Sequence, residues 1–293
     1  MSVRRFQKPL QDFLTSNADF SIIYNTKPSA NGNINHFVTR NTKRIFVLDS
    51  SFNPPHLGHY ALIKELMDHD YFENNGSSEI AKDDSEDRSI LLLLSVQNAD
   101  KGNVPESFEN RIEMMYLMAK DLSYKLSLTH NVSIGLTKHA RFVDKSLSIL
   151  DYLHHNELHE RTENRIKMTF LVGFDTLVRI FNPQYYLPDK LSSSLDEFMK
   201  STDIFCLTRN DKKISLEEQA KYIDEIREGN HEHIPQHWSQ SIFLSKNKGE
   251  IIGLISSSNV RENILSGKTD WYKNVIPEIR DFIVNEKLYK LSE

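Results

Sequence analysis

The 293-residue sequence contains one cysteine and no apolar run that approaches the roughly 20 residues of a membrane-spanning helix. A single cysteine excludes an intramolecular disulfide framework and is typical of a reducing compartment. Cys206 lies inside the apolar run 204–207, which favours a buried strand thiol over a nucleophile. The polar amino terminus lacks the apolar core of a secretory signal. We therefore expect a cytoplasmic protein without membrane association, with the nucleus as an alternative location.

The sequence also lacks an excess of positive charge. Its 36 lysines and arginines are outnumbered by 41 aspartates and glutamates, which gives a formal net charge of −5. Without a global basic field, nucleic acid is not an expected partner. Basic groups that contact an anionic ligand must therefore act locally. Hydrophobic residues make up 39% of the sequence, which is enough to build a full α/β core at this length.

Strand-like apolar runs alternate with helical patterns along most of the chain. The expected strands lie at 45–48, 90–96, 132–136, 168–172, 203–207 and 242–244. The expected helices lie at 59–69, 108–126, 144–160, 175–182, 194–200, 215–228, 258–266 and 276–285. This alternation indicates an α/β fold with a mostly parallel, doubly wound sheet and helices on both faces. Ligands then bind beyond the carboxyl ends of the strands.

Two segments fall outside this alternation. Residues 1–43 form an N-terminal extension that is expected to be helical from about Phe6 to Tyr24, ahead of a main domain over 44–293. Residues 73–89 are acidic, contain serine and have few large apolar side chains. This composition predicts a mobile surface loop.

The most informative segment is DSSFNPPHLGH at 49–59, because it follows an apolar run and leads directly into a helical pattern. A tight turn from a strand to a helix exposes free backbone N–H groups at the positive end of the helix dipole, which favours an anion. His56 and His59 can reach a phosphate bound there, and Gly58 is expected to let the substrate approach the backbone. In isolation, the two histidines could equally be ordinary residues at a helix start.

A second candidate anion site is ISSSNVR at 255–261, which again follows apolar residues and precedes a helical pattern. Serine hydroxyls at a helix start can cap free N–H groups. Arg261, one turn into the helix, can place a forked and permanently charged group over phosphate oxygens. A plain serine cap would explain one serine, but it does not explain three serines followed by arginine.

The remaining histidines do not form a metal pattern. His231, His233 and His237 lie close together, but no cysteine is nearby and their spacing matches no zinc signature. His155 and His159 share a helix face without a pattern of carboxylate partners. We expect structural or surface roles for all of them and no metal held by the protein alone.

Together, these segments resemble the nucleotidyltransferase superfamily with its HxGH and ISSSxxR-type signatures, and within it the nicotinamide mononucleotide adenylyltransferases. Five further segments resemble that family in the same order, namely SFNP at 51–54, VQNADK at 96–101, FENRIEMM at 108–115, LVGFDTL at 171–177 and FCLTR at 205–209. The resemblance implies a Rossmann-like fold of this superfamily with additional C-terminal helices. It also implies adenylyl transfer from ATP to nicotinamide mononucleotide (NMN), with Mg²⁺ accompanying the ATP.

The resemblance implies roles for individual residues. His59 would contact the α-phosphate, His56 would support the triphosphate, and Arg261 would hold the β- and γ-phosphates. The implied ATP-binding residues are Ser51, Phe52, His56, His59, Gly173, Asp175, Ser256, Ser257, Ser258 and Arg261. The implied mononucleotide-binding residues are Ser50, Ser51, Lys101, Phe142 and Tyr186.

The sequence departs from the family pattern at three places. In the lysine loop, Pro105 follows residues 101–104 where the family has further basic residues. Ser50 stands where the family's turn has glycine, so its Cβ would crowd the substrate or require another backbone angle. The tryptophan that stacks on the nicotinamide ring in many members has no counterpart at 139–142, where Phe142 is the candidate substitute. Two alternatives stay open: a nucleotidyltransferase or ATPase acting on another phosphorylated small molecule, and an ATP-binding adaptor with little catalysis. A homo-oligomer is also compatible with the sequence.

Overall fold

A computed structural model describes residues 5–27, 37–39, 42–68, 88–96, 106–125, 131–156, 166–209, 214–246 and 255–289. Lys101 and most of the loop expected at 73–89 lie outside these described residues. Arg88 and Ser89, the last two residues of that expected loop, instead begin a strand.

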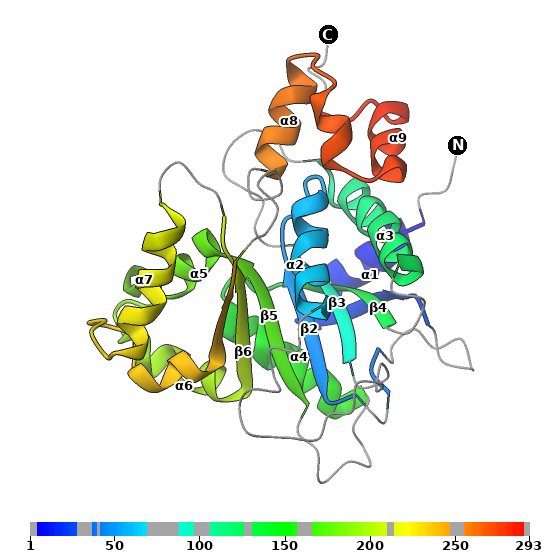
Figure 1. Ribbon diagram of the computed structural model, residues 1–293. Coiled ribbons are helices and arrows are strands. Elements are labelled where there is room, and N and C mark those ends of the chain that lie inside the picture. The colour runs from blue at the N-terminus through cyan, green and yellow to red at the C-terminus, as the bar shows by residue number, and fades with distance from the viewer. Residues whose placement is uncertain are drawn as a thin grey trace.

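The described strands form one seven-stranded sheet in the order β1-β4-β3-β2-β5-β6-β7 (Figure 1). The strands are β1 (Phe20–Asn25), β2 (Arg44–Asp49), β3 (Arg88–Ser95), β4 (Asn131–Thr137), β5 (Lys167–Gly173), β6 (Thr202–Leu207) and β7 (Ile242–Ser245). Neighbouring strands are parallel, except that β1 is antiparallel to β4. The predicted mostly parallel, doubly wound sheet is confirmed.

The N-terminal segment differs from its prediction. Helix α1 (Gln7–Thr15) ends well before Tyr24, and β1 follows it as an edge strand of the sheet. The run FSIIY is rich in aromatic and β-branched residues, which favour a strand, and β4 supplies its hydrogen-bond partners. The expected helix is therefore wrong beyond Thr15. The division of the chain at residue 43 stays a prediction.

Helices cover both faces of the sheet (Figure 1). Those that follow α1 are α2 (Leu57–Asp68), α3 (Phe108–Lys125), α4 (Phe142–Asn156), α5 (Phe174–Ile180), α6 (Leu191–Ser201), α7 (Leu216–Arg227), α8 (Ser257–Leu265) and α9 (Pro277–Asn285). Short 3-10 helices are η3 (Pro183–Tyr185), η4 (Gln236–Ser241) and η6 (Asp270–Asn274).

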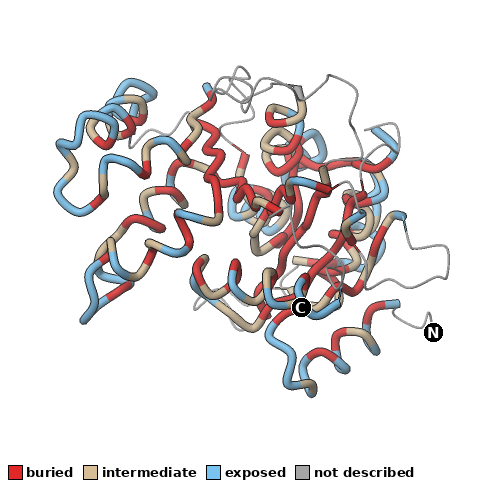
Figure 2. The backbone as a smooth tube through the Cα atoms, turned by 90° about the horizontal axis from the view of Figure 1, so that it is seen from below, coloured by how far each residue is buried: buried red, intermediate tan, exposed pale blue. Residues whose placement is uncertain are grey.

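The sheet separates two hydrophobic cores, because successive side chains of a strand point to opposite faces. Phe46 and Leu48 of β2 belong to one core, together with side chains from α1, α2, α3 and α9. Ile45 and Val47 belong to the other core, together with side chains from α4, α5, α6 and α7. The strands are buried along most of their length (Figure 2). This burial on both faces explains why the strands appear in the sequence as continuous apolar runs.

The winding of the sheet changes direction at β2. Strands β3 and β4 lie on one side of β2, whereas β5, β6 and β7 lie on the other. In such a sheet a crevice forms beyond the carboxyl ends of the strands at the change of direction. Ser50 directly follows β2, and Gly173 ends β5. The first predicted anion site, which follows β2, therefore lies at this edge of the sheet.

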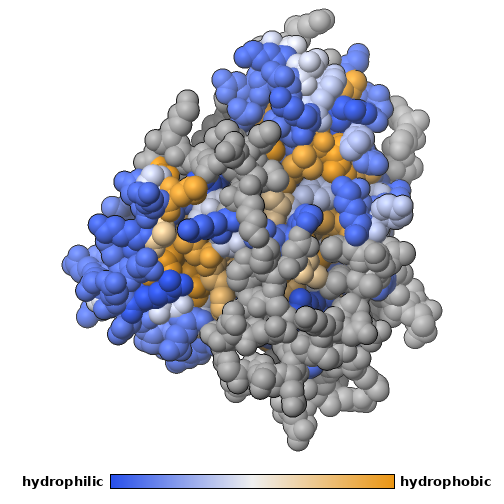
Figure 3. All heavy atoms as spheres, viewed as in Figure 1, coloured by the Kyte–Doolittle hydropathy of each residue, from blue (hydrophilic) through white to orange (hydrophobic). Residues whose placement is uncertain are grey.

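The surface seen in Figure 3 is hydrophilic over the outer sides of α7 and α8. No helix in the described ranges is both long and apolar enough to cross a membrane. Cys206 is 0% exposed in β6, which confirms the predicted strand thiol.

Candidate functional site

The turn between β2 and α2 has a strained backbone. Phe52 has a φ of 47°, in the left-handed region that bulky residues rarely adopt, at a cost of about 1–3 kcal/mol. The centroid of its buried ring lies 5.2 Å from that of His59. The buried Arg111 of α3 holds the turn by donating from Nε to the carbonyl oxygen of Ser51 (2.7 Å). Contacts within the protein therefore hold the turn.

Hydrogen bonds to the backbone set the tautomers of both histidines. The backbone N–H of His56 donates to Nδ1 of His59 (3.0 Å), and the backbone N–H of Gly58 donates to Nδ1 of His56 (3.1 Å). Because Nδ1 is the acceptor in each ring, the proton of the neutral imidazole is on Nε2. The ring centroids lie 3.9 Å apart. One turn thus holds two Nε2–H donors side by side.

Both histidines are neutral at physiological pH. His56 is 8% exposed and His59 is 6% exposed. Burial, followed by the positive charge of Arg209, lowers the pKa of His59 to about 3. Burial, followed by His59 and Arg209, also lowers the pKa of His56 well below its usual range. The histidines therefore supply directed hydrogen bonds, whereas permanent positive charge at the site comes from arginine.

Gly58 has a packing role beside His56. A Cβ at this position would lie 2.9 Å from two ring atoms of His56, closer than real Cβ atoms approach. The missing side chain therefore makes room for the imidazole. Any larger residue at position 58 would displace His56.

Two of the three serines at the start of α8 bind backbone groups. Ser256 caps the helix, because its side chain accepts from the backbone N–H three residues further on (3.1 Å). Ser257 instead donates from Oγ to the carbonyl oxygen of Pro54 in the first turn (2.8 Å). The predicted helix cap is thus made by one serine, and the next serine joins the two segments.

Arg261 also joins the two segments. Its Nη1 donates to the carbonyl oxygen of Asn53 (2.6 Å), and its Nη2 donates to Oγ of Ser258 (3.2 Å). The predicted catalytic residues His56, His59 and Arg261 therefore belong to two segments in direct contact. In Figure 1, α8 accordingly lies beside the start of α2.

Arg209 links α5 to the start of α8. Its Nη1 donates to Oδ1 of Asp175 in α5 (3.1 Å), and its Nη2 donates to the carbonyl oxygen of Ile255 (3.1 Å). A Cβ at Gly173 would lie 3.0 Å from Asp175 Oδ1 and 3.3 Å from Arg209 Cδ. Gly173 and Asp175 are thus brought to the same site. The likeness of segment 205–209 to the family motif was the available signal for Arg209.

Ser50 lies against the histidines. Its Oγ is 2.9 Å from Nε2 of His59. A residue that replaces glycine was expected to require an altered backbone angle. Ser50 does not have a positive φ, because the non-glycine residues with positive φ in the described chain are Phe52, Lys287 and Tyr289. Ser50 is thus accommodated without strain at φ.

Phe142 and Tyr186, which were predicted to bind the mononucleotide, differ in how far they are buried. Phe142 begins α4, and its ring lies 5.0 Å from Nζ of Lys145, which forms a buried ion pair with Asp49 (2.5 Å) at the end of β2. Tyr186 is 6% exposed, and its hydroxyl donates to the carbonyl oxygen of Ile180 (2.7 Å). Its ring therefore has little free surface for stacking, whereas Phe142 is only partly buried.

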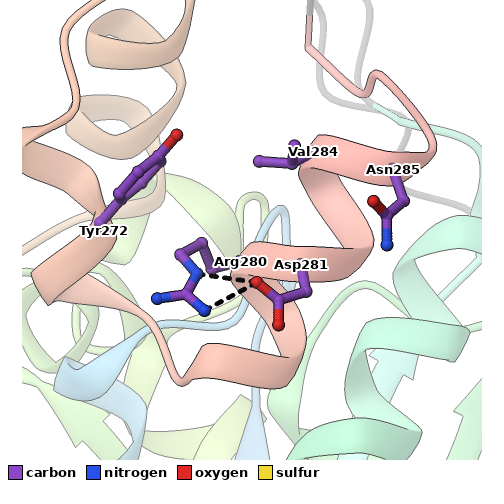
Figure 4. Close-up of a pocket in the computed structure, with 5 residues that line it drawn as sticks. All are labelled: Tyr272, Arg280, Asp281, Val284 and Asn285. Atoms are coloured by element: carbon purple, nitrogen blue, oxygen red, sulfur yellow. Dashed lines mark hydrogen bonds and ion pairs between the residues drawn. The ribbon is translucent and has the colours of Figure 1, made fainter.

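A groove between η6 and α9 is lined by none of these residues (Figure 4). Its arginine, Arg280, is paired with the neighbouring Asp281 (2.8 Å), so its charge is already compensated. Within the described part of the chain, no three His, Cys, Asp or Glu side chains are arranged to hold a metal ion.

Known proteins are similar to this chain in sequence and in fold. No family model matches it. A Schizosaccharomyces pombe protein described as a candidate nicotinamide mononucleotide adenylyltransferase is 35% identical over 238 residues, which cover 80% of this chain and 82% of that protein. Plasmodium falciparum nicotinic acid mononucleotide adenylyltransferase in complex with NaAD has a TM-score of 0.52 at 17% identity, over 84% of this chain and 97% of its own. The same enzyme in complex with APC has a TM-score of 0.51 at 18% identity, with the same coverage. At these identities, the two structures show similarity to this chain in fold alone.

Proposed function

The chain belongs to the nicotinamide mononucleotide adenylyltransferase family, and we propose that it transfers the adenylyl group of ATP to NMN, giving NAD and pyrophosphate. One arrangement carries the proposal. Two neutral histidines from the turn after β2 and a permanently charged arginine from the start of α8 meet at the edge of the sheet where ligands bind. Arg261 and Asn53 are 208 residues apart in sequence, yet a hydrogen bond joins them.

The charges at this site suit a triphosphate. Arg261 and Arg209 are permanent cations with forked donors that match phosphate oxygens. The N-termini of α2 and α8 add the positive ends of two helix dipoles. In a protein whose formal net charge is −5, this local concentration of donors is what would attract ATP.

Adenylyl transfer needs little covalent chemistry from the protein. An oxygen of the NMN 5′-phosphate attacks the α-phosphorus of ATP in line, a new P–O bond forms, and the bond to the β-phosphate breaks as pyrophosphate leaves. Negative charge builds on the phosphate oxygens during this step, so fixed donors aimed at them account for the rate. His59 and His56 would serve as such donors, with Arg261 holding the departing β- and γ-phosphates.

Mg²⁺ would arrive with ATP and be held mainly by phosphate oxygens, which is its usual mode of binding in nucleotide sites. In the mononucleotide part of the site, Lys101 would bind the NMN phosphate and Phe142 would stack on the pyridine ring, as the family resemblance implies. Small nucleotides are thus the proposed partners. The single buried cysteine supports a reducing compartment, either cytoplasm or nucleus.

A substrate panel tests the proposal. The protein is incubated with ATP, Mg²⁺ and one mononucleotide at a time, including NMN and nicotinic acid mononucleotide, and the products are identified by mass spectrometry. We expect pyrophosphate and a dinucleotide with NMN. A dinucleotide formed only with some other phosphorylated compound would change the substrate but keep the reaction. ATP binding without any product would instead favour the adaptor alternative.

A further inference from the structure

The Ser50 hydroxyl occupies the hydrogen bond that His59 would otherwise give to a phosphate. Its Oγ lies 2.9 Å from Nε2 of His59. Because Nδ1 of His59 accepts from the His56 backbone (3.0 Å), Nε2 carries the proton of the neutral ring and Ser50 Oγ is the acceptor. A hydroxyl that accepts a hydrogen bond keeps its own proton for donation. Among the described residues, no group accepts that proton from Ser50.

We propose that Ser50 is a further catalytic residue, whose hydroxyl donates to a non-bridging oxygen of the α-phosphate while it accepts from His59 Nε2–H. This inference rests on the proposed function and refines it, because His59 would act on the α-phosphate through the Ser50 hydroxyl instead of donating to the phosphate directly. No proton is transferred between Ser50, His59 and the phosphate in this step. The serine proton stays on Oγ, and the histidine proton stays on Nε2. The pair acts as one chain of donors that ends at the reacting phosphate.

The chain of donors suits the charge that develops during transfer. Consecutive hydrogen bonds polarise one another, so the Nε2–H of His59 makes the Ser50 hydroxyl a stronger donor. The bond from Ser50 to the phosphate should strengthen as negative charge builds, which favours the transition state over bound ATP. A neutral imidazole has a single N–H, and here that N–H already points to the serine.

The opposite role for Ser50 is competition. If ATP had to displace the serine from His59, removing the hydroxyl would free the histidine and raise the rate. The two roles therefore predict opposite effects for Ser50→Ala and for Ser50→Gly, the variant that restores the residue typical of the family. Their opposite signs make the substitutions a decisive test.

Steady-state kinetics of five variants provide that test. We expect Ser50→Ala and Ser50→Gly each to lower kcat by ~10- to 100-fold, the range for losing a hydrogen bond to a charged group, with little change in the KM for ATP. In a His59→Ala background, Ser50→Ala should cost little more, because the two residues act as a unit. Ser201→Ala is the matched control, since its hydroxyl bonds only carbonyl oxygens of its own helix. Unchanged or faster turnover in both Ser50 variants, or fully additive effects with His59→Ala, would overturn the proposal.

A spectroscopic measurement separates this inference from the proposed function. In protein labelled with ¹⁵N-histidine, the Nε2 resonance of His59 should shift in Ser50→Ala without any nucleotide present, while the protonated nitrogen remains Nε2. An unchanged resonance would refute the hydrogen bond and the proposal with it. Failure of the wild-type protein to form any dinucleotide would instead count against the proposed function.

Discussion

At the scale of single residues, the site depends on keeping two imidazoles neutral and correctly protonated. His56 and His59 each accept a backbone N–H at Nδ1, so each offers Nε2–H as a donor. Burial is the main reason that both stay uncharged. An uncharged donor needs no counterion, and its hydrogen bond still strengthens when the acceptor gains negative charge.

His59→Ala should therefore lower kcat far more than it weakens ATP binding. His59 donates to the Ser50 hydroxyl, which would in turn donate to the developing oxyanion. Loss of such a donor typically costs ~10²–10³ in rate, and its contribution is smallest in the ground state. Turnover is measured by pyrophosphate release, and affinity is measured by calorimetry with a non-hydrolysable ATP analogue. Equal turnover in the mutant and the wild type would remove His59 from the mechanism.

Arg261 differs from the histidines in carrying a permanent charge. Both Nη atoms of its guanidinium group donate hydrogen bonds within the protein. Arg261→Lys keeps the charge but loses the fork that contacts Asn53 and Ser258. We expect a KM for ATP that rises by several-fold, with a smaller change in kcat. Arg280→Lys is the matched control, since Arg280 is paired with Asp281 outside the site. An ATP KM as small as that of the control would mean that the arginine only ties α8 to the turn.

At the scale of elements, the site is assembled from strand ends and helix starts that are distant in the sequence. Arg209 after β6 contacts α5 through Asp175 and the start of α8 through Ile255. Its charge also reaches both histidines and lowers their pKa values. The Arg209 side chain thus connects β6, α5 and α8, and its charge lowers the pKa values of the two histidines at the start of α2.

Arg209→Gln should raise the pKa of both histidines, because the substitution removes a positive charge that disfavours the imidazolium form. Burial remains, so both values should stay below 6.5. The titration is followed by NMR of the histidine ring protons in the free protein. Arg227→Gln is the control, since Arg227 pairs with Asp224 on α7. Unchanged histidine titrations in Arg209→Gln would show that the arginine is too well screened to affect the site.

Much of the fold could be predicted from sequence, because strands buried on both faces form continuous apolar runs. The turn at 49–59 and the segment at 255–261 were visible as motifs, and the structure brings them into contact. The pairing of β1 with β4 could not be predicted, since it depends on a strand edge more than 100 residues away, such as Thr137 opposite Phe20. The roles of Arg209 and Gly58 likewise depend on neighbours that only the folded chain provides.

At the scale of the whole molecule, the two buried, neutral histidines make the stability of the fold sensitive to acid. The pKa of His59 falls to about 3 on folding from an ordinary value of 6.5. Below pH 6.5 the unfolded chain therefore binds a proton that the folded chain does not, and stability is lost as pH falls from 6.5 towards 3. Above pH 6.5 both states are neutral and this loss is absent. The expected slope is about 1.4 kcal/mol per pH unit for each such histidine.

Urea unfolding at pH 7, 6 and 5 measures this effect. His59→Gln removes one titrating group and leaves the carboxylates in place, so the free energy of unfolding should fall less steeply with acid than in the wild type. The difference between the two slopes isolates the contribution of His59. Parallel pH profiles for the two proteins would mean that His59 is protonated as easily in the folded state as in the unfolded state.

The most direct test of adenylyl transfer follows the α-phosphorus of ATP. The protein is incubated with Mg²⁺, NMN and ATP that carries ³²P in the α-phosphate, and the products are separated by chromatography. The expected result is that the label appears in NAD, that the released pyrophosphate is unlabelled, and that His59→Ala strongly reduces the amount of labelled NAD. Label that remains in ADP or AMP, with no labelled dinucleotide, would contradict it.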